Sequence, residues 1–321
     1  MIVIAIPAGF RVAAMMRETA EPTALSSDGS RLVMADGLSM HYRQWGPDDG
    51  MPVVLIHGTL AWAETWRDIA GPLGDAGFRV IAPDIPPFGL SQRPPENDYS
   101  RTAQARIIIA FLDAMALERP VLVGHSFGGG ATVEAAAMRG DDIRGLVLLD
   151  AALGLSTPDK GPPWFSPLFA FEPVRTAFAS TTFANPLFIP SGLRAFVADD
   201  TIVTDERVAI YRRPLSAKGT SAAIGAWLQT GLYGAHDGAR TTSRQGMSEI
   251  AIPSLVIWGR EDTVTPLEQG VEIADLLPDA RLAVLENVNH IPHVEAPDDV
   301  LGEMLPFLTA LRAGAESGLR P

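Results

Sequence analysis

The 321-residue sequence predicts an α/β protein in which a mostly parallel sheet is covered by helices on both faces. Short apolar runs recur along the chain, and they lie largely between segments with helical spacing. These runs are continuous rather than alternating, which indicates strands buried on both faces, as in a parallel sheet between layers of helices. The runs lie at 52–58, 78–84, 120–126, 143–150, 253–259 and 280–286.

An antiparallel hairpin is expected before the first of these runs. Residues 31–45 read as two short strands around Asp36-Gly37, a dipeptide that favours a tight hairpin turn. Apolar residues alternate along the second strand of the hairpin, which is typical of a strand with one buried face.

A long segment without any buried-strand run interrupts the pattern. Residues 155–250 contain 11 of the 23 aromatic residues of the chain. We interpret this segment as a mostly helical cap, inserted after the sixth strand and lying over one end of the sheet. Most of its aromatic residues should form its own core and a few should line a cavity. The core of the protein is then 29–154 and 251–321, with 1–28 as an N-terminal tail or short helix.

Composition excludes several kinds of function. A net charge of −13 and the absence of basic runs argue against nucleic acid as a partner. The chain has no cysteine, which rules out disulfides, thiolate metal sites and a cysteine nucleophile. The apolar N-terminus is interrupted by Arg11, and it lacks the charge pattern of a signal peptide. We expect a cytoplasmic protein, with membrane contact through this segment or export as alternatives, and the oligomeric state stays open.

The stretch "VLVGHSFGGGATVEAA" at 121–136 carries the first chemical signal. Residues 124–128 fit Gly-x-Ser-x-Gly between a buried strand and a helix, the context in which this motif holds a nucleophilic serine. A turn that sharp strains its central residue, and the glycines let the helix and strand approach each other. Ser126 is therefore predicted as the nucleophile, with its hydroxyl at the positive end of a helix.

A serine nucleophile needs a base, and histidine is the usual one. Of the six histidines, His41 lies in the hairpin, His236 lies in the insertion, and His125 neighbours the serine with its side chain directed elsewhere. His290 follows the last predicted strand, where open α/β sheets place their sites, and it is the predicted base. His57 and His293 remain, and for His293 we expect a surface or supporting role.

The base in turn needs an orienting carboxylate. Asp262 lies just past a buried strand, and the chain order serine, acid, histidine is the order that this kind of sheet uses. We predict Asp262 as the acid. Asp150, at the end of "LVLLD", is the rival. Asp84 also ends a strand, but it begins a proline-rich turn, and we expect it to organise that loop.

Together these motifs resemble the α/β-hydrolase superfamily, in its serine-nucleophile, esterase-like subgroup with a helical cap. The resemblance covers residues 31–311. It implies a mostly parallel eight-stranded sheet, a Ser-His-Asp triad, and neither cofactor nor metal. The motifs that carry it are "HGTLAWAETW", "DIPPFGLSQRP", "GHSFGG", "WGREDTVTP" and "NHIPHVEAP".

The resemblance also implies an oxyanion hole. His57-Gly58 looks like the family's oxyanion loop, so the backbone N–H groups of Thr59 and Phe127 are expected to bind the developing oxyanion. Trp66 resembles a tryptophan that packs behind this loop.

Two positions depart from the family's pattern. Pro87 stands where the turn after the second parallel strand usually has its first glycine, and Asn289 replaces the glycine that usually precedes the histidine. Asparagine tolerates positive φ better than most residues, so the loop geometry is expected to survive. Neither change touches the triad.

The residues also narrow the reaction. A serine at 126 argues against haloalkane dehalogenases and epoxide hydrolases, which resemble this layout but attack with aspartate. "HGTL" lacks the Gly-Pro-Gly typical of proline iminopeptidases and many carbon–carbon bond hydrolases. We expect hydrolysis of apolar carboxylic esters with short to medium acyl chains through an acyl-enzyme. The alternatives are a cofactor-free perhydrolase or haloperoxidase, a carbon–carbon bond hydrolase on the same triad, a hydroxynitrile lyase, and a non-catalytic small-molecule sensor.

Overall fold

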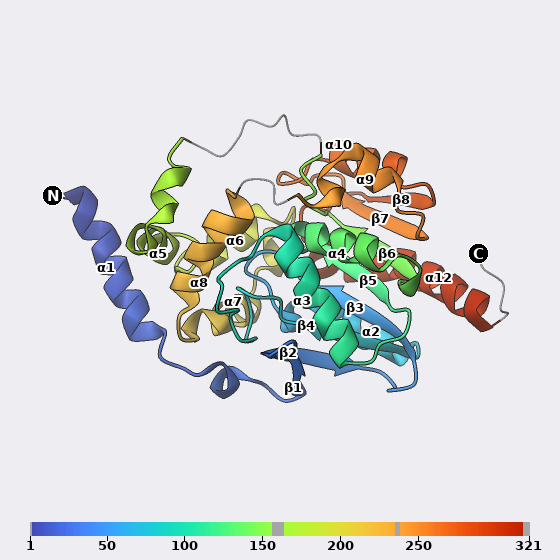
Figure 1. Ribbon diagram of the computed structural model, residues 1–321, viewed down its shortest axis with the longest axis horizontal. Coiled ribbons are helices and arrows are strands. Elements are labelled where there is room, and N and C mark those ends of the chain that lie inside the picture. The colour runs from blue at the N-terminus through green and yellow to red at the C-terminus, as the bar shows by residue number, and fades with distance from the viewer. Residues whose placement is uncertain (1, 156–163, 235–237, 317–321) are drawn as a thin grey trace.

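A computed structural model describes residues 2–155, 164–234 and 238–316. Its centre is one eight-stranded sheet with the strand order β1-β2-β4-β3-β5-β6-β7-β8 (Figure 1). Strand β2 pairs antiparallel with β1 and β4, and all other pairs are parallel. The predicted mostly parallel sheet is confirmed. The strands are β1 (Ser30–Ala35), β2 (Leu38–Trp45), β3 (Met51–Ile56), β4 (Phe78–Pro83), β5 (Val121–His125), β6 (Gly145–Leu149), β7 (Ser254–Gly259) and β8 (Ala280–Leu285).

The hairpin of β1 and β2 turns at the expected dipeptide. Ala35 pairs with Leu38 across the turn, and Asp36 and Gly37 have φ of 46° and 79°. Positive φ at both central residues is what a two-residue turn of this hand requires, and aspartate followed by glycine supplies it at low steric cost.

Two separate apolar cores cover the faces of the sheet, which explains why the strand runs are continuous. On β5, Leu122 belongs to one core while Val121 and Val123 belong to the other. Helices α3, α4 and α10 cover the first face, and α2 and α12 cover the second. Their bounds are α2 (Arg67–Asp75), α3 (Arg101–Ala114), α4 (Ser126–Arg139), α10 (Leu267–Leu276) and α12 (Pro297–Glu316); the short α11 (Pro292–Glu295) precedes α12.

The predicted helical cap lies between β6 and β7, and its described residues contain no strand. A third apolar core, which includes Trp227, joins the cap to the loops of the sheet edge. Residues 238–250 differ from the rest of this range, because Thr241 bonds Glu134 of α4 and Met247 belongs to a sheet core. The helices of the range are α5 (Glu172–Thr181), α6 (Ile189–Ala195), α7 (Asp205–Arg212), α8 (Thr220–Trp227) and α9 (Arg244–Ser248).

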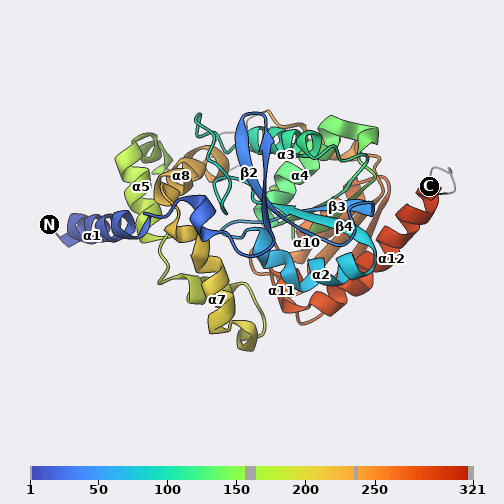
Figure 2. The same cartoon turned by 90° about the horizontal axis from the view of Figure 1, so that it is seen from below.

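The N-terminal segment forms a helix, α1 (Ile2–Arg17), that lies beside α5 and away from the sheet (Figures 1 and 2). Its last turn is fastened to the cap, because Arg17 donates to the backbone oxygens of Leu215 at 3.0 Å and Ala184 at 2.9 Å. None of the described helices has both the length and the apolar character needed to cross a bilayer.

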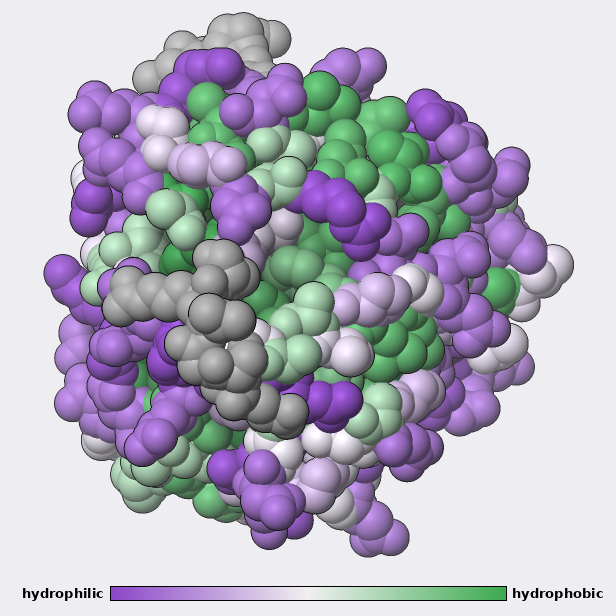
Figure 3. All heavy atoms as spheres, turned by 90° about the vertical axis from the view of Figure 1, so that its right-hand side faces the viewer, coloured by the Kyte–Doolittle hydropathy of each residue, from purple (hydrophilic) through white to green (hydrophobic). Residues whose placement is uncertain are grey.

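Large exposed apolar side chains are concentrated on α1 and the cap. Trp164 is the most exposed, at 88%. The others in this part of the molecule are Val12, Met15, Met16, Leu168, Phe171, Val174, Phe178, Leu187, Phe188 and Leu232. The face shown in Figure 3, which is the right-hand side of Figure 1, mixes hydrophilic residues around its rim with smaller hydrophobic groups between them.

Candidate active site

The turn from β5 into α4 holds Ser126 in a strained conformation. Its φ is 49°, in the left-handed region that non-glycine residues seldom occupy. A Cβ at Gly124 would lie 2.6 Å from Oγ1 of Thr132 on α4, and one at Gly128 would lie 2.2 Å from the backbone oxygen of His57. The glycines therefore allow the strand, the helix and the neighbouring loop to meet around the serine.

Three side chains from three strand ends meet at this turn. Oγ of Ser126 lies 2.7 Å from Nε2 of His290, in the loop after β8. Nδ1 of His290 lies 2.8 Å from Oδ2 of Asp262, in the loop after β7. All three residues are buried. The structure thus brings the predicted nucleophile, base and acid into one hydrogen-bonded chain at the carboxyl edge of the sheet.

Asp262 accepts an unusual number of hydrogen bonds. Its Oδ1 accepts from the backbone N–H groups of Val264 at 2.7 Å and Thr265 at 2.9 Å. Its Oδ2 accepts from Oγ1 of Thr265 at 2.6 Å besides the bond with His290. Burial alone would raise the pKa of Asp262, but His290, Thr265 and Asp150 outweigh burial and lower this pKa to about 2.

Asp150, the rival acid, forms no hydrogen bond with His290 among the described residues. Among the described residues, Nδ1 of His290 contacts Asp262 and Thr265. Oδ1 of Asp150 accepts the backbone N–H of Gly259 at 2.9 Å. Burial raises the pKa of Asp150 well above its ordinary value, and the charge of Asp262 raises it further.

The predicted oxyanion loop lies against the serine. Thr59 lines the same cavity as Ser126. A Cβ at Gly58 would lie 2.9 Å from Cβ of Ser126, so only glycine allows this approach. Phe127 lies in the first turn of α4, where backbone N–H groups have no acceptor within the helix. These two N–H groups stay the predicted oxyanion donors.

His57 fixes the position of this loop. Nε2 of His57 accepts the backbone N–H of Ile85 at 2.9 Å, so the ring proton is on Nδ1. Nδ1 can then donate to the backbone oxygen of Gly58, 2.9 Å away. Burial lowers the pKa of His57, which keeps the ring neutral as both bonds require.

Asp84 organises its loop, as the sequence indicated. Its two carboxylate oxygens accept the backbone N–H groups of Ala63 and Leu90, each at 2.7 Å. Nδ1 of His41 lies 2.8 Å from Oδ2. Burial would raise the pKa of Asp84, but His41, His57 and the N–H of Ala63 hold it below its ordinary value. The contact between Asp84 and His41 on β2 could not be predicted from the sequence.

A second layer of rings lies behind the base. Nε2 of His125 lies 2.8 Å from the backbone oxygen of His290, and it must donate because a carbonyl only accepts. Burial lowers the pKa of His125 to about 3, and the neighbouring His290 adds to this shift. The ring of His293 lies 4.2 Å from Trp66 and 4.6 Å from His125, between centroids. His293 is thus a buried supporting residue, and Trp66 lies behind the site.

The substitution at 289 acts in a way that we did not expect. Positive φ falls at Asn287, with φ of 58°, and not at Asn289. Asn289 instead uses its side chain, because its Oδ1 accepts the backbone N–H of Thr263 at 3.0 Å. Asn289 thereby ties the loop of the base to the loop of the acid.

A cavity of about 600 Å³ opens onto Ser126 and His290. Its walls come mainly from apolar residues of the cap, and no Lys, Arg, Asp or Glu is among its described lining residues. The few polar groups besides the serine and histidines include Thr182 and Asn185. The cap aromatics that line the cavity are Phe183, Phe188, Phe196, Tyr211 and Trp227.

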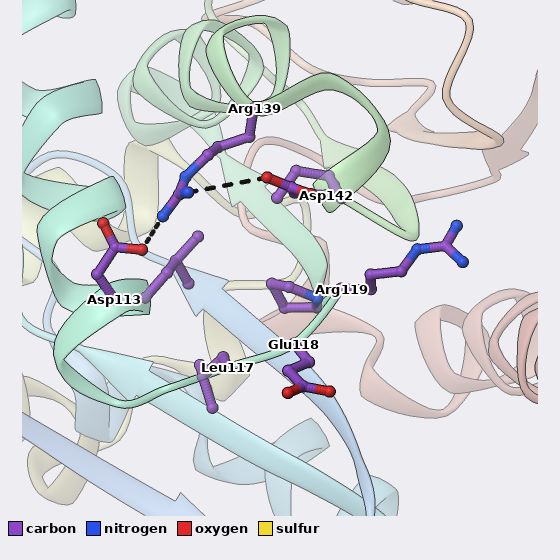
Figure 4. Close-up of a pocket in the computed structure, with 9 residues that line it drawn as sticks. Asp113, Leu117, Glu118, Arg119, Arg139 and Asp142 are labelled. Carbon is purple, nitrogen blue, oxygen red and sulfur yellow. Dashed lines mark hydrogen bonds and ion pairs between the residues drawn. The ribbon is translucent and has the colours of Figure 1, made fainter.

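A smaller hollow of about 330 Å³ lies at the opposite edge of the sheet (Figure 4). It is bordered by Pro120 and Ile143, just before β5 and β6 begin. Arg139 crosses it to form ion pairs with Asp113 and Asp142. Glu118 and Arg119 also border this hollow, which lies away from Ser126 and His290.

Comparison with known proteins agrees with this arrangement. A family model described as "alpha/beta hydrolase fold" matches residues 51–297. The chain is 29% identical over 276 residues to a 2-hydroxymuconate semialdehyde hydrolase of Pseudomonas sp. (strain CF600), covering 84% of this chain and 90% of the relative. It is 28% identical over 285 residues to the 2-hydroxy-6-oxo-6-phenylhexa-2,4-dienoate hydrolase of Comamonas testosteroni, covering 84% and 91%.

A solved structure of an α/β-hydrolase-fold protein from Burkholderia ambifaria is also similar. Its TM-score is 0.70 at 25% sequence identity, over 87% of this chain and 98% of that chain. The family match, the order of the strands and the serine at the end of β5 agree. The chain belongs to the α/β-hydrolase fold family.

Proposed function

We propose that this protein hydrolyses neutral, apolar carboxylic esters of short to medium acyl chain length. Ser126 is the nucleophile, His290 is the general base and acid, and Asp262 orients the imidazole. The backbone N–H groups of Thr59 and Phe127 bind the oxyanion. The observation that carries the proposal is the apolar cavity above the serine, with no charged side chain among its described walls.

In the first half of the reaction, Oγ of Ser126 attacks the ester carbonyl carbon while Nε2 of His290 takes the hydroxyl proton. The carbonyl oxygen becomes an oxyanion and accepts hydrogen bonds from the two N–H groups. Asp262 keeps the proton of His290 on Nδ1, so Nε2 is free to act as base. The intermediate collapses, the alcohol leaves with the proton from His290, and an acyl-serine remains.

In the second half, water replaces the alcohol. His290 takes a proton from the water, the hydroxide attacks the acyl carbon, and the same N–H groups bind the second oxyanion. Collapse breaks the bond to the serine, whose oxygen regains its proton from His290. The products are a carboxylic acid and the regenerated enzyme.

The walls of the cavity support a neutral substrate. A carboxylate that leaves water for an apolar site needs a cation or several donors, because burying an unpaired charge is strongly unfavourable. Burial of methylene groups is favourable instead, with a transfer free energy of about 0.8 kcal/mol for each one buried. The cavity therefore favours acyl chains over charged groups until the chain reaches the far wall.

The direct test is a series of p-nitrophenyl esters with acyl chains of increasing length. We expect kcat/KM to rise over the first carbons and then to fall. A matched pair sharpens the test, because p-nitrophenyl pentanoate and the p-nitrophenyl monoester of succinic acid are similar in size but differ in charge. The neutral ester should be the better substrate. Faster turnover of the charged ester would contradict the proposal.

Hydrolysis of a carbon–carbon bond is the second candidate, because the relatives favour it. The relative from Comamonas testosteroni is named for a dienoate, which is a carboxylate. The same triad could serve that reaction, but the cavity offers no Lys or Arg among its described walls to pair with such a group. The loss of the absorbance of 2-hydroxy-6-oxo-6-phenylhexa-2,4-dienoate tests this candidate. Turnover of the dienoate above that of every ester would favour it.

A further inference from the structure

Asp150 is a buried carboxyl group that the proposed reaction does not use. It follows β6 directly, is fully buried and has φ of 43°. One carboxylate oxygen, Oδ1, accepts the N–H of Gly259, whereas no N–H or O–H donor of the described chain reaches Oδ2. Asp262 is the neighbouring carboxyl group. Its backbone N–H donates to the oxygen of Gly259, the same residue whose N–H is bound by Asp150. Oγ1 of Thr265 lies 3.2 Å from the backbone oxygen of Asp150 and 2.6 Å from Oδ2 of Asp262.

Two carboxyl groups can form a hydrogen bond only if one of them carries a proton, because a carboxylate has no donor. The donors around the pair decide which one it is. Asp262 already accepts four hydrogen bonds, from Val264, from the backbone and hydroxyl of Thr265, and from His290. Asp150 accepts one, from Gly259. The negative charge is therefore better stabilised on Asp262, and the proton belongs on Asp150.

We propose that Asp150 is a neutral carboxylic acid that donates a hydrogen bond to Asp262 and so positions the acid of the triad. The proposal rests on the proposed role of Asp262. In this arrangement Asp150 is a fifth donor to the carboxylate. It makes Asp262 a weaker acceptor toward His290 than a less solvated carboxylate would be.

The charged and titratable groups around Asp150 agree with a neutral acid. Asp262 faces it from the loop after β7, and Glu295 on α11 adds a second negative charge. His290 is hydrogen-bonded to Asp262, and the buried His125 and His293 have pKa values below the ordinary value of histidine. Among the described residues, an ionised Asp150 would thus meet two carboxylates and one N–H donor.

The first experiment compares three variants in kcat, KM and the pH profile of ester hydrolysis. Asp150→Asn keeps the shape and supplies an amide donor, so it should retain at least about a third of kcat/KM. Asp150→Leu removes the donor and should lower kcat by roughly tenfold with little change in KM. In the pH profile of Asp150→Leu, the rise of activity on the acid side should move to higher pH by about half a unit, because Asp262 then stabilises protonated His290 more strongly. Asp141→Asn, on the surface, is the matched control.

The second experiment does not depend on activity. The infrared band of a protonated carboxylic acid should be present in the parent at pH 7 and absent in Asp150→Asn. Absence of the band from the parent would overturn the proposal, and so would a loss in Asp150→Asn as large as in Asp262→Asn. Unchanged kinetics and pH profile in folded Asp150→Leu would do the same. A present band in an enzyme without esterase activity would instead contradict only the proposed function.

Discussion

The carboxyl edge of the sheet and the cap lie on opposite sides of one cavity, and they are built differently. At the sheet edge, polar side chains are buried and paired: His290 with Ser126 and Asp262, and His57 with Ile85 and Gly58. Each of these groups follows a strand that is itself fixed between two apolar cores. Hydrogen bonds of this kind define distances and directions closely.

The cap has the opposite character. It consists of short helices joined by short 3₁₀ turns and one π-helical turn. Its rings contact each other mainly edge to face. Trp227 contacts Phe183 of the cap, and it also contacts Phe88 and Phe127 of the sheet edge. Apolar contacts are not directional, so such a wall tolerates changes of shape better than the sheet edge does.

This contrast indicates that the sheet edge controls turnover and that the cap controls the choice of substrate. A change at the sheet edge should remove turnover for every substrate, because it breaks a geometry that all substrates share. A change in the cap should reorder substrates and leave the chemistry intact. Four substitutions or sets of substitutions test this division, from the largest expected effect to the smallest.

The largest effect is expected at the hydroxyl that attacks the substrate. Ser126→Ala removes it and should lower kcat by roughly 10⁶-fold, with the residual rate coming from the oxyanion donors and binding. Stopped assays with a p-nitrophenyl ester measure this loss. Ser248→Ala, on the exposed side of α9, should keep parental activity. A folded Ser126→Ala variant with more than a few per cent of activity would show that another group is the nucleophile.

The acid should show a smaller loss. Asp262→Asn replaces an acceptor by an amide that can donate, which favours the wrong tautomer of His290, and kcat should fall by on the order of 10⁴-fold. The same assay under identical conditions compares it with Asp150→Asn. A larger loss at 150 than at 262 would transfer the role of acid to Asp150.

The sheet edge could be predicted from sequence because its signals are local. Buried strands appear in the sequence as continuous apolar runs. The residues that follow the carboxyl ends of parallel strands lie at the same edge of the sheet, whatever the conformation of the loops. This placed Ser126, Asp262 and His290 correctly relative to one another. It also placed Asp84 in its loop, since an aspartate beside a proline-rich turn is a common organiser of backbone.

The remaining features depend on packing between distant segments, which has no local signal. His125 follows the strand pattern, yet its ring supports the backbone of His290 from 165 residues away. Asn289 was expected to supply positive φ, but the structure gives that conformation to Asn287. The apolar pattern of the cap could not separate Phe183, which lines the cavity, from Phe171, which is exposed, because both are simply hydrophobic.

Phe183 and Phe171 test whether the cap sets the acyl preference. Phe183→Ala enlarges the cavity beside Trp227, so the preferred acyl chain should become longer by a few carbons. Each added methylene is worth about 0.8 kcal/mol, or close to fourfold in kcat/KM. Phe171→Ala removes an equal ring from the exposed side of the cap and should leave the profile unchanged. Equal profiles for the two variants would mean that the cap does not set acyl preference.

The smallest effect concerns stability at the sheet edge. The raised pKa of Asp150 means that the folded protein favours the neutral form of this side chain. Its contribution to the free energy of unfolding is therefore complete below the pKa of aspartate in the unfolded chain, about 3.9. This contribution is lost as the pH rises toward the pKa of Asp150 in the folded protein. Asn at this position cannot ionise in either state. The Tm of Asp150→Asn minus that of the parent should therefore increase between about pH 4 and pH 8, by a few degrees, since 1 kcal/mol shifts Tm by about 2–4 °C. Thermal melts of both proteins and of Asp141→Asn across this range measure it. A constant difference would place an ionised Asp150 in the folded protein.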